Sequence, residues 1–153
     1  QMVMNLSSVE FRVVLAGRGS LEDAYREKYG ILIDGGYLEL LGNVRDIDSV
    51  FNMCRIFCFM SLWEGYPNAL VEAMSAALPI VISKRLKGFH EFVEDNVNGR
   101  VVEDVKMLSA INELINNNSA LDTYSKNSRI KYINLQSKDP TKEWNKLLGR
   151  AFG

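Results

Sequence analysis

Two glutamates flank a short turn in the segment LWEGYPNALVEAM, which runs from Leu62 to Met74. Glu64 precedes the Gly-Tyr-Pro-Asn turn, and Glu72 follows it, eight positions after Glu64. Pro67 is suited to the first position of a helix, where the following backbone amides have no intrahelical acceptor. Because the positive end of the helix dipole lies behind those amides, the segment predicts a binding site for an anion such as phosphate.

The amides expected to be free are those of Asn68, Ala69 and Leu70. Glu72 would lie one helical turn further on, where it would accept hydrogen bonds from the vicinal hydroxyls of a ribose. Two carboxylates beside a phosphate repel it unless both bind neutral hydroxyl groups, and a sugar nucleotide carries such groups on both sides of its pyrophosphate. The spacing fits a second interpretation equally well, in which Glu64 is a solvated loop residue and Glu72 merely complements the helix dipole.

The elements that must position this turn alternate along the chain between strand and helix patterns. Ser20 is expected to cap the first helix and Gly30 to end it. The alternation favours an α/β fold, a doubly wound, mostly parallel Rossmann-like sheet with helices on both faces, which binds ligands at the carboxyl ends of its strands. Short apolar runs predict buried strands at 11–17, 37–44, 56–60, 79–83 and 98–102. Helical periodicity predicts helices at 20–30, 46–54, 68–78, 88–95, 104–118, 120–135 and 141–151.

Length and charge narrow the class of protein. A chain of 153 residues is sufficient for a single domain, here predicted to span residues 1–153. Its net charge of -1 gives no field that would gather nucleic acid, so no nucleic-acid partner is expected. No apolar run approaches the roughly 18 residues needed to span a bilayer, and the expected location is the cytoplasm. Cys54 and Cys58 lie among apolar residues and are predicted to be buried thiols.

The segment SLWEGYPNALVEAMSAALPIVIS is similar to the donor-site signature of the family-4 retaining glycosyltransferases with the GT-B fold. The segments VVLAGRG, LELLGNVRD and GFHEFVEDNVNGRVV follow the same family's order, so that the resemblance covers about Phe11 to Leu121. It implies the donor-binding domain of an enzyme that moves a hexose from a nucleotide-diphosphate sugar to an acceptor hydroxyl with retained configuration. Cell-surface polysaccharide or lipopolysaccharide synthesis is the implied setting, with no cofactor and no metal.

The same resemblance implies roles for individual residues. Glu64, as the catalytic residue, would contact hydroxyls of the donor hexose, and Glu72 would bind the ribose hydroxyls. Backbone amides of the turn would hold the distal phosphate, and the loop ending at Arg45 would lie beside the base. The implied donor-binding residues are Glu72, Gly65, Tyr66, Pro67, Asn68, Ala69, Gly17, Val44 and Arg45.

The chain also departs from the family's pattern. The N-terminal acceptor domain and the first strand of the donor domain, which carries an Arg and a Lys that clamp the pyrophosphate, have no counterpart in the sequence. The sheet would then lack a central strand, leaving unpaired backbone on two neighbours. The expected partners are a nucleotide sugar, the missing acceptor domain and another copy of the chain, reached through the incomplete sheet. For the full-length protein, a peripheral location at the inner face of the membrane stays open as an alternative. This chain alone is expected not to catalyse sugar transfer.

Two other functions remain as alternatives. A non-catalytic α/β binding or interaction module derived from such an enzyme is favoured by the missing phosphate clamps. A sugar-nucleotide epimerase of the same architecture ranks low because such sites depend on histidines, and His90 is the only one. The sequence Asp46-Ile47-Asp48 formally matches a metal motif of another glycosyltransferase fold, but its place at a helix start predicts an N-cap. The basic loop at 84–88 is interpreted as solvated in preference to phosphate-neutralising.

Overall fold

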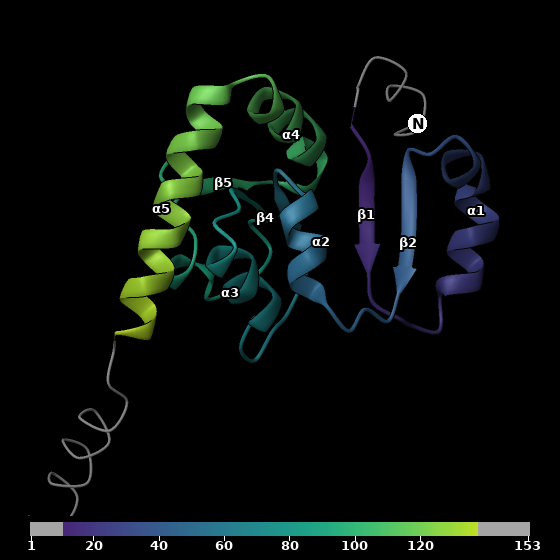
Figure 1. Ribbon diagram of the computed structural model, residues 1–153, viewed down its shortest axis with the longest axis horizontal. Coiled ribbons are helices and arrows are strands. Elements are labelled where there is room, and N and C mark those ends of the chain that lie inside the picture. Colours follow the sequence, from purple (N-terminus) through teal and green to yellow (C-terminus); the bar gives the residue numbers. More distant parts are fainter. Residues whose placement is uncertain (1–10, 138–153) are drawn as a thin grey trace, which may run out of the picture. The chain divides into compact units, whose positions relative to one another are not determined.

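The computed structural model describes residues 11–137. These residues divide between two compact units, whose boundary lies between Ile47 and Asp48. All strand pairs in both units are parallel, and helices follow the strands along the chain (Figure 1). The predicted α/β class with parallel strands is therefore confirmed. The predicted helix at 141–151 lies outside the described residues.

The first unit pairs β1 (Val13–Ala16) with β2 (Leu38–Gly42), and α1 (Glu22–Asp34) connects them and packs against β2 (Figure 1). The prediction of a strand at 11–17 is confirmed, but the prediction that it is buried is wrong. Val13 is 40% exposed and Leu15 is 46% exposed. The reason is that, among residues 11–137, β1 belongs to a sheet of two strands, and that α1 contains no buried residue with which to cover it.

The boundaries of α1 differ from the predicted ones. Leu21, not Ser20, is the N-cap residue, and no side chain caps this helix. The helix also continues through Gly30, with a kink at Tyr29, where φ is -114°. It ends at the following glycine pair, because the amides of residues 35 and 36 bond back to carbonyls of the last helical turn.

The second unit is built on a three-stranded sheet of order β3-β4-β5. Its strands and helices are α2 (Ile47–Met53, which begins at the boundary), β3 (Phe57–Phe59), α3 (Asn68–Ser75), β4 (Ile80–Ser83), the 3₁₀ turn η2 (Phe89–Glu91), β5 (Gly99–Val102), the 3₁₀ turn η3 (Asp104–Lys106), α4 (Met107–Ile115) and α5 (Asn118–Gln136). The predicted helices at 88–95 and 104–118 are thus partly 3₁₀. Val105, an apolar residue within the predicted helix at 104–118, is 88% exposed and belongs to η3.

The core of the second unit lies between β4, β5, α4 and α5. Every residue of β4 is buried, as expected for the central strand of a parallel sheet. Helices α4 and α5 pack against each other, and α5 also packs against α3 (Figure 1). The buried side chains of this core come from β4, β5 and the two C-terminal helices and are Val81, Val102, Met107, Ala110, Leu114, Leu121 and Tyr124.

The turn into β5 depends on a glycine and an asparagine. Gly99 pairs with Ile80, and a Cβ atom added at Gly99 would collide with the carbonyl oxygen of Ile80 and lie 2.8 Å from its carbonyl carbon. Asn98 is fully buried, and its side chain donates to the carbonyl of Phe92 and accepts from the amide of Glu94. These contacts place η2 and the following loop against the sheet.

Four strands have an edge that pairs with no strand among residues 11–137, namely β1 and β2 in the first sheet and β3 and β5 in the second. β1 pairs only with β2, and β3 pairs only with β4. The described strands accordingly form two sheets and not the single sheet that was predicted.

Candidate functional site

The turn that precedes α3 lies at the carboxyl end of β3. Pro67 is the N-cap residue, with φ of -81° and ψ of 74°, which are close to the values of an inverse γ-turn. The amide of Asn68 donates to the carbonyl of Tyr66 over 2.9 Å and closes that turn. The carbonyl of Pro67 then accepts from the amides of Leu70 and Val71, at 3.0 and 3.2 Å.

This geometry corrects the predicted set of free amides. Asn68 and Leu70 already donate within the chain, because Pro67 occupies the cap and not the first helical position. The amide of Ala69 has no acceptor in the part of the chain that the structure describes, and the same holds for the amides of Gly65 and Tyr66. Free amide donors therefore lie both before and after Pro67, and the one after it, on Ala69, lies at the start of α3.

The two glutamates of the signature are both exposed to solvent. Glu72 lies on the outer face of α3, opposite the buried residues that anchor the helix. The backbone carbonyl of Glu72 accepts from the Ser75 hydroxyl and the Ala76 amide, but among the described residues neither carboxylate has a hydrogen bond or ion pair. Both carboxylates are thus available to accept hydrogen bonds from hydroxyl groups.

Tyr66 is the member of the turn whose side chain reaches the rest of the second unit. Its ring is 56% exposed and meets the ring of Phe92 edge to face, with 5.6 Å between the centroids and 81° between the planes. Pro67 is buried and fixes the other side of the turn. The turn is therefore attached at its base, whereas Glu64 and Gly65 project into solvent.

The remaining predicted donor-binding residues belong to the first unit. Gly17 follows β1 with φ of 134°, a conformation that favours glycine, and its amide donates to the carbonyl of Gly42 over 2.7 Å. Val44 and Arg45 follow β2, the former half-buried and the latter exposed. The structure thus brings the loops after β1 and β2 together within the first unit, at the carboxyl ends of both strands.

Two basic residues of the loop after β4 are already paired with acidic neighbours. Lys84 pairs with Glu103 over 3.2 Å, and Arg85 pairs with Asp104 over 2.7 Å. The hydroxyl of Ser83 also donates to Asp104, and the hydrogen bonds from Ser83 and Arg85 lower the pKa of the Asp104 carboxyl. The interpretation of a phosphate-binding loop is thereby weakened. The sequence did not predict the acidic partners of this loop, Glu103 and Asp104, because they follow a different strand. Only the parallel register of β4 and β5 brings them close to Lys84 and Arg85.

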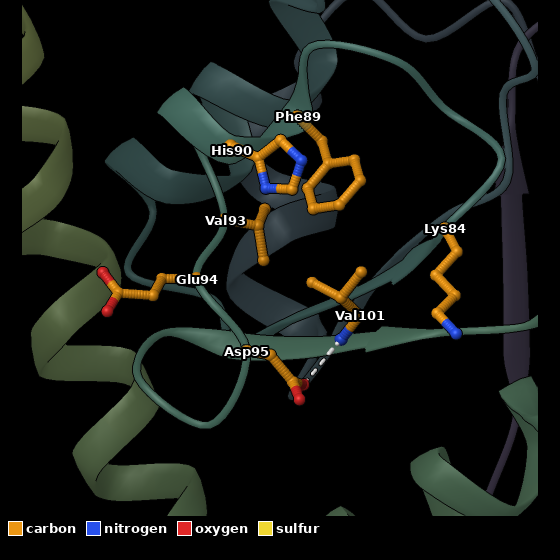
Figure 2. A pocket seen from close by; sticks show the side chains of 7 residues that line it. All are labelled: Lys84, Phe89, His90, Val93, Glu94, Asp95 and Val101. Carbon is orange, nitrogen blue, oxygen red and sulfur yellow. Dashed lines mark hydrogen bonds between the residues drawn. The ribbon is translucent and has the colours of Figure 1, made fainter.

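An open pocket of about 660 Å³ lies beside β5 in the second unit (Figure 2). Neither Glu64 nor Glu72 lines it, so both carboxylates of the predicted donor site lie outside this pocket. The carboxylate of Asp95 at its rim accepts from the amide of Val101 over 2.9 Å and so covers part of the β5 edge. The lining residues come from the loop after β4, from η2, from the loop that follows η2 and from β5, and are Lys84, Phe89, His90, Val93, Glu94, Asp95 and Val101.

Cysteine burial was predicted incorrectly. Cys54 is half-buried and Cys58 is exposed, and neither forms a disulfide. Cys58 lies on β3, which has a strand partner on one side only among the described residues. Within residues 11–137 no three His, Cys, Asp or Glu side chains are grouped so as to hold a metal ion. That part of the chain also has no helix long and apolar enough to cross a membrane.

Comparison with known proteins places this arrangement among the glycosyltransferases with the GT-B fold. The structure of a pneumococcal O-GlcNAc transferase, solved in complex with UDP and GlcNAc, matches 91% of this chain and 29% of its own, with a TM-score of 0.76 and 19% sequence identity. The family model described as glycosyl transferases group 1 matches residues 2–117. The chain belongs to this family, and the resemblance to GT-B glycosyltransferases seen in the sequence is confirmed.

Curated relatives agree with that assignment. An α-1,3-galactosyltransferase of Escherichia coli that acts on GlcNAc-diphosphoundecaprenol is 35% identical over 99 residues, which are 63% of this chain and 25% of the relative. An α-1,4-N-acetylgalactosaminyltransferase of Campylobacter jejuni that acts on an undecaprenol-linked saccharide is 21% identical over 92% of this chain and 40% of its own length. The chain thus spans less than half the length of these relatives.

Proposed function

We propose that this chain provides the nucleotide-sugar site of a retaining glycosyltransferase, which transfers a hexose to an acceptor hydroxyl. The observation that carries the proposal is the exposed turn before α3, where three amides and the two carboxylates on either side of them have no partner among residues 11–137. Membership of the group 1 family supports it, because the turn and both carboxylates lie within the matched residues. The site would function by stabilising the leaving diphosphate as negative charge develops on it.

Each group in the second unit has a role in this proposal. The amides of Tyr66 and Ala69 would donate to the distal phosphate, where negative charge develops as the glycosidic bond breaks. Glu72 would accept hydrogen bonds from the ribose hydroxyls, and Glu64 from hydroxyls of the hexose. Charged acceptors make stronger hydrogen bonds than neutral ones, so the two carboxylates would fix the donor's orientation across the turn.

The roles of Gly17, Val44 and Arg45 toward the nucleoside stay predictions, because these residues belong to the first unit. The free approach to Gly17 suits this role, since nothing lies within 4 Å of a Cβ atom added there. The absence of a required metal or cofactor stays a prediction. The acceptor would bind to an N-terminal domain of the kind that this family possesses.

The relatives suggest the chemistry of both substrates. Those named above act on saccharides linked through diphosphate to undecaprenol, and the structural neighbour was solved with UDP. We therefore propose a uridine-diphosphate sugar as donor and a lipid-linked saccharide as acceptor, in the assembly of a cell-surface polysaccharide. An enzyme with such an acceptor would work at the cytoplasmic face of the membrane.

A thermal-shift panel tests the proposal directly. The chain is heated with UDP, GDP and ADP and with sugars attached to each nucleotide, at several concentrations. A ligand that binds only the folded state raises Tm, and a concentration of 100 times Kd adds about 2.7 kcal/mol of stability. The proposal expects a shift with the uridine series. No shift with any nucleotide would instead favour the non-catalytic module.

A further inference from the structure

The turn before α3 has few attachments, although its amides must be held in place to bind a phosphate. Leu62, Trp63 and Glu64 are exposed, and the hydroxyl of Ser61 bonds only to the carbonyl of Trp63. Among the described residues no hydrogen bond or ion pair joins a side chain of residues 62–66 to another segment. Some other contact must therefore fix the orientation of the peptide groups on either side of Tyr66.

The edge-to-face contact of Tyr66 with Phe92 meets this requirement. The Tyr66 carbonyl accepts from the Asn68 amide, so the position of this residue sets the γ-turn that aims the neighbouring amides. Phe92 is only 5% exposed and follows η2 directly. A buried ring in contact with an exposed one can hold it in a fixed place at little cost in side-chain entropy.

The backbone of Phe92 is itself held by a buried polar contact. Its carbonyl accepts from the Asn98 side chain over 3.0 Å, and the same side chain accepts from the Glu94 amide over 2.8 Å. The backbone carbonyl of Asn98 accepts from Ser128 of α5 over 3.2 Å. Asn98 and Ser128 are both fully buried. A continuous set of contacts therefore runs from α5 through Asn98 and Phe92 to Tyr66.

We propose that Phe92 is a positioning residue for the donor-binding turn and acts through the ring of Tyr66. The assignment of that turn to donor binding rests on the proposed function, whereas the effect of Phe92 on the turn does not. The interaction free energy of such an aromatic pair is large enough that losing the pair, and so letting the turn move, would change a ligand's affinity roughly two- to tenfold.

Phe92→Leu is the test variant, and the structure offers a matched control. Phe51 is also 5% exposed and also meets a partner edge to face, since its ring lies 5.8 Å from that of Phe57 at 82°. Phe51→Leu thus removes an equivalent pair from the same unit, one that joins α2 to β3 and involves no residue of the turn. Backbone ¹⁵N relaxation of the free chain and titration with UDP are measured for both variants.

The proposal expects lower order parameters at Gly65 and Tyr66 in Phe92→Leu, with UDP binding weakened roughly two- to tenfold. Phe51→Leu should leave both measurements at their wild-type values. An equal effect of the two variants, or a rigid turn in Phe92→Leu, overturns the proposal. If Phe92→Leu does not fold, Tyr66→Leu removes the same contact from the exposed side and must loosen Gly65 likewise. A turn that loosens in a chain that never binds UDP refutes the proposed function alone.

Discussion

Replacing Gly99 by alanine tests the packing that places η2 and β5. Gly99 does not have a positive φ, so an alanine there is opposed by lack of space and not by backbone conformation. The added Cβ would collide with the carbonyl oxygen of Ile80 and lie 2.8 Å from its carbonyl carbon and 3.1 Å from its Cα. All three atoms belong to the backbone of the buried central strand, which cannot rotate away as a side chain could.

The expected loss of stability is large for so small a substitution. Overpacking a core costs about 1–3 kcal/mol, and a clash between two paired strands belongs at the upper end of that range. For a chain of this size each kcal/mol lowers Tm by roughly 2–4 °C, so that Gly99→Ala should lower it by roughly 6–12 °C. Thermal unfolding followed by circular dichroism measures the change.

Gly65→Ala is the matched control, since it adds the same methyl group where nothing lies within 4 Å. Its free energy of unfolding should stay within about 0.5 kcal/mol of the wild-type value. A Gly99→Ala chain that unfolds as the wild type does would refute the β4–β5 register on which the reasoning rests.

Two further predictions concern the same unit. Asn98→Ala leaves the Phe92 carbonyl and the Glu94 amide without their partner, so urea unfolding should show a free energy of unfolding lower by about 2–4 kcal/mol. The control is Asn116→Ala, at an exposed position, which should change the free energy of unfolding little. Equal effects of the two variants would contradict the role of Asn98. The second prediction concerns Asp104, whose carboxyl has a lower pKa in the folded than in the unfolded chain. Its carboxylate therefore stabilises the folded state fully at a pH above the unfolded pKa, and this stabilisation is lost as the pH falls through the folded pKa. Wild type should therefore exceed Asp104→Asn in stability at pH 7, and the difference should shrink below a pH of about 4; a difference independent of pH would exclude the charged contact.

The order of elements was predictable because local signals determine it. Apolar runs located every described strand, and the Pro67 signal placed the start of α3 within one residue. Burial was harder to predict, because it depends on which strands become neighbours. Val13 and Cys58 lie in runs that are typical of buried strands, yet each is exposed, on a strand that pairs on one side only among the described residues.

The site was predictable in its residues and less so in its details. The glutamates and the turn are contiguous in sequence, so a motif identifies them. The state of each amide depends on the ψ angle of Pro67, which no residue pattern determines. The contact between Tyr66 and Phe92 and the ion pairs of Lys84 and Arg85 join segments distant in sequence, so only the folded chain shows them.

The measurement that tests the central claim most directly is calorimetric titration of a uridine-diphosphate sugar into the wild type, Glu72→Ala and Asp122→Ala. Asp122 is the control because its carboxylate is exposed on a helix of the same unit and has no ion pair among the described residues. A hydrogen bond to a charged group contributes about 1.5–3 kcal/mol, so Glu72→Ala should bind the donor roughly ten- to a hundredfold more weakly. Asp122→Ala should bind as the wild type does. Equal affinity in all three proteins would contradict the assignment of Glu72 to the donor.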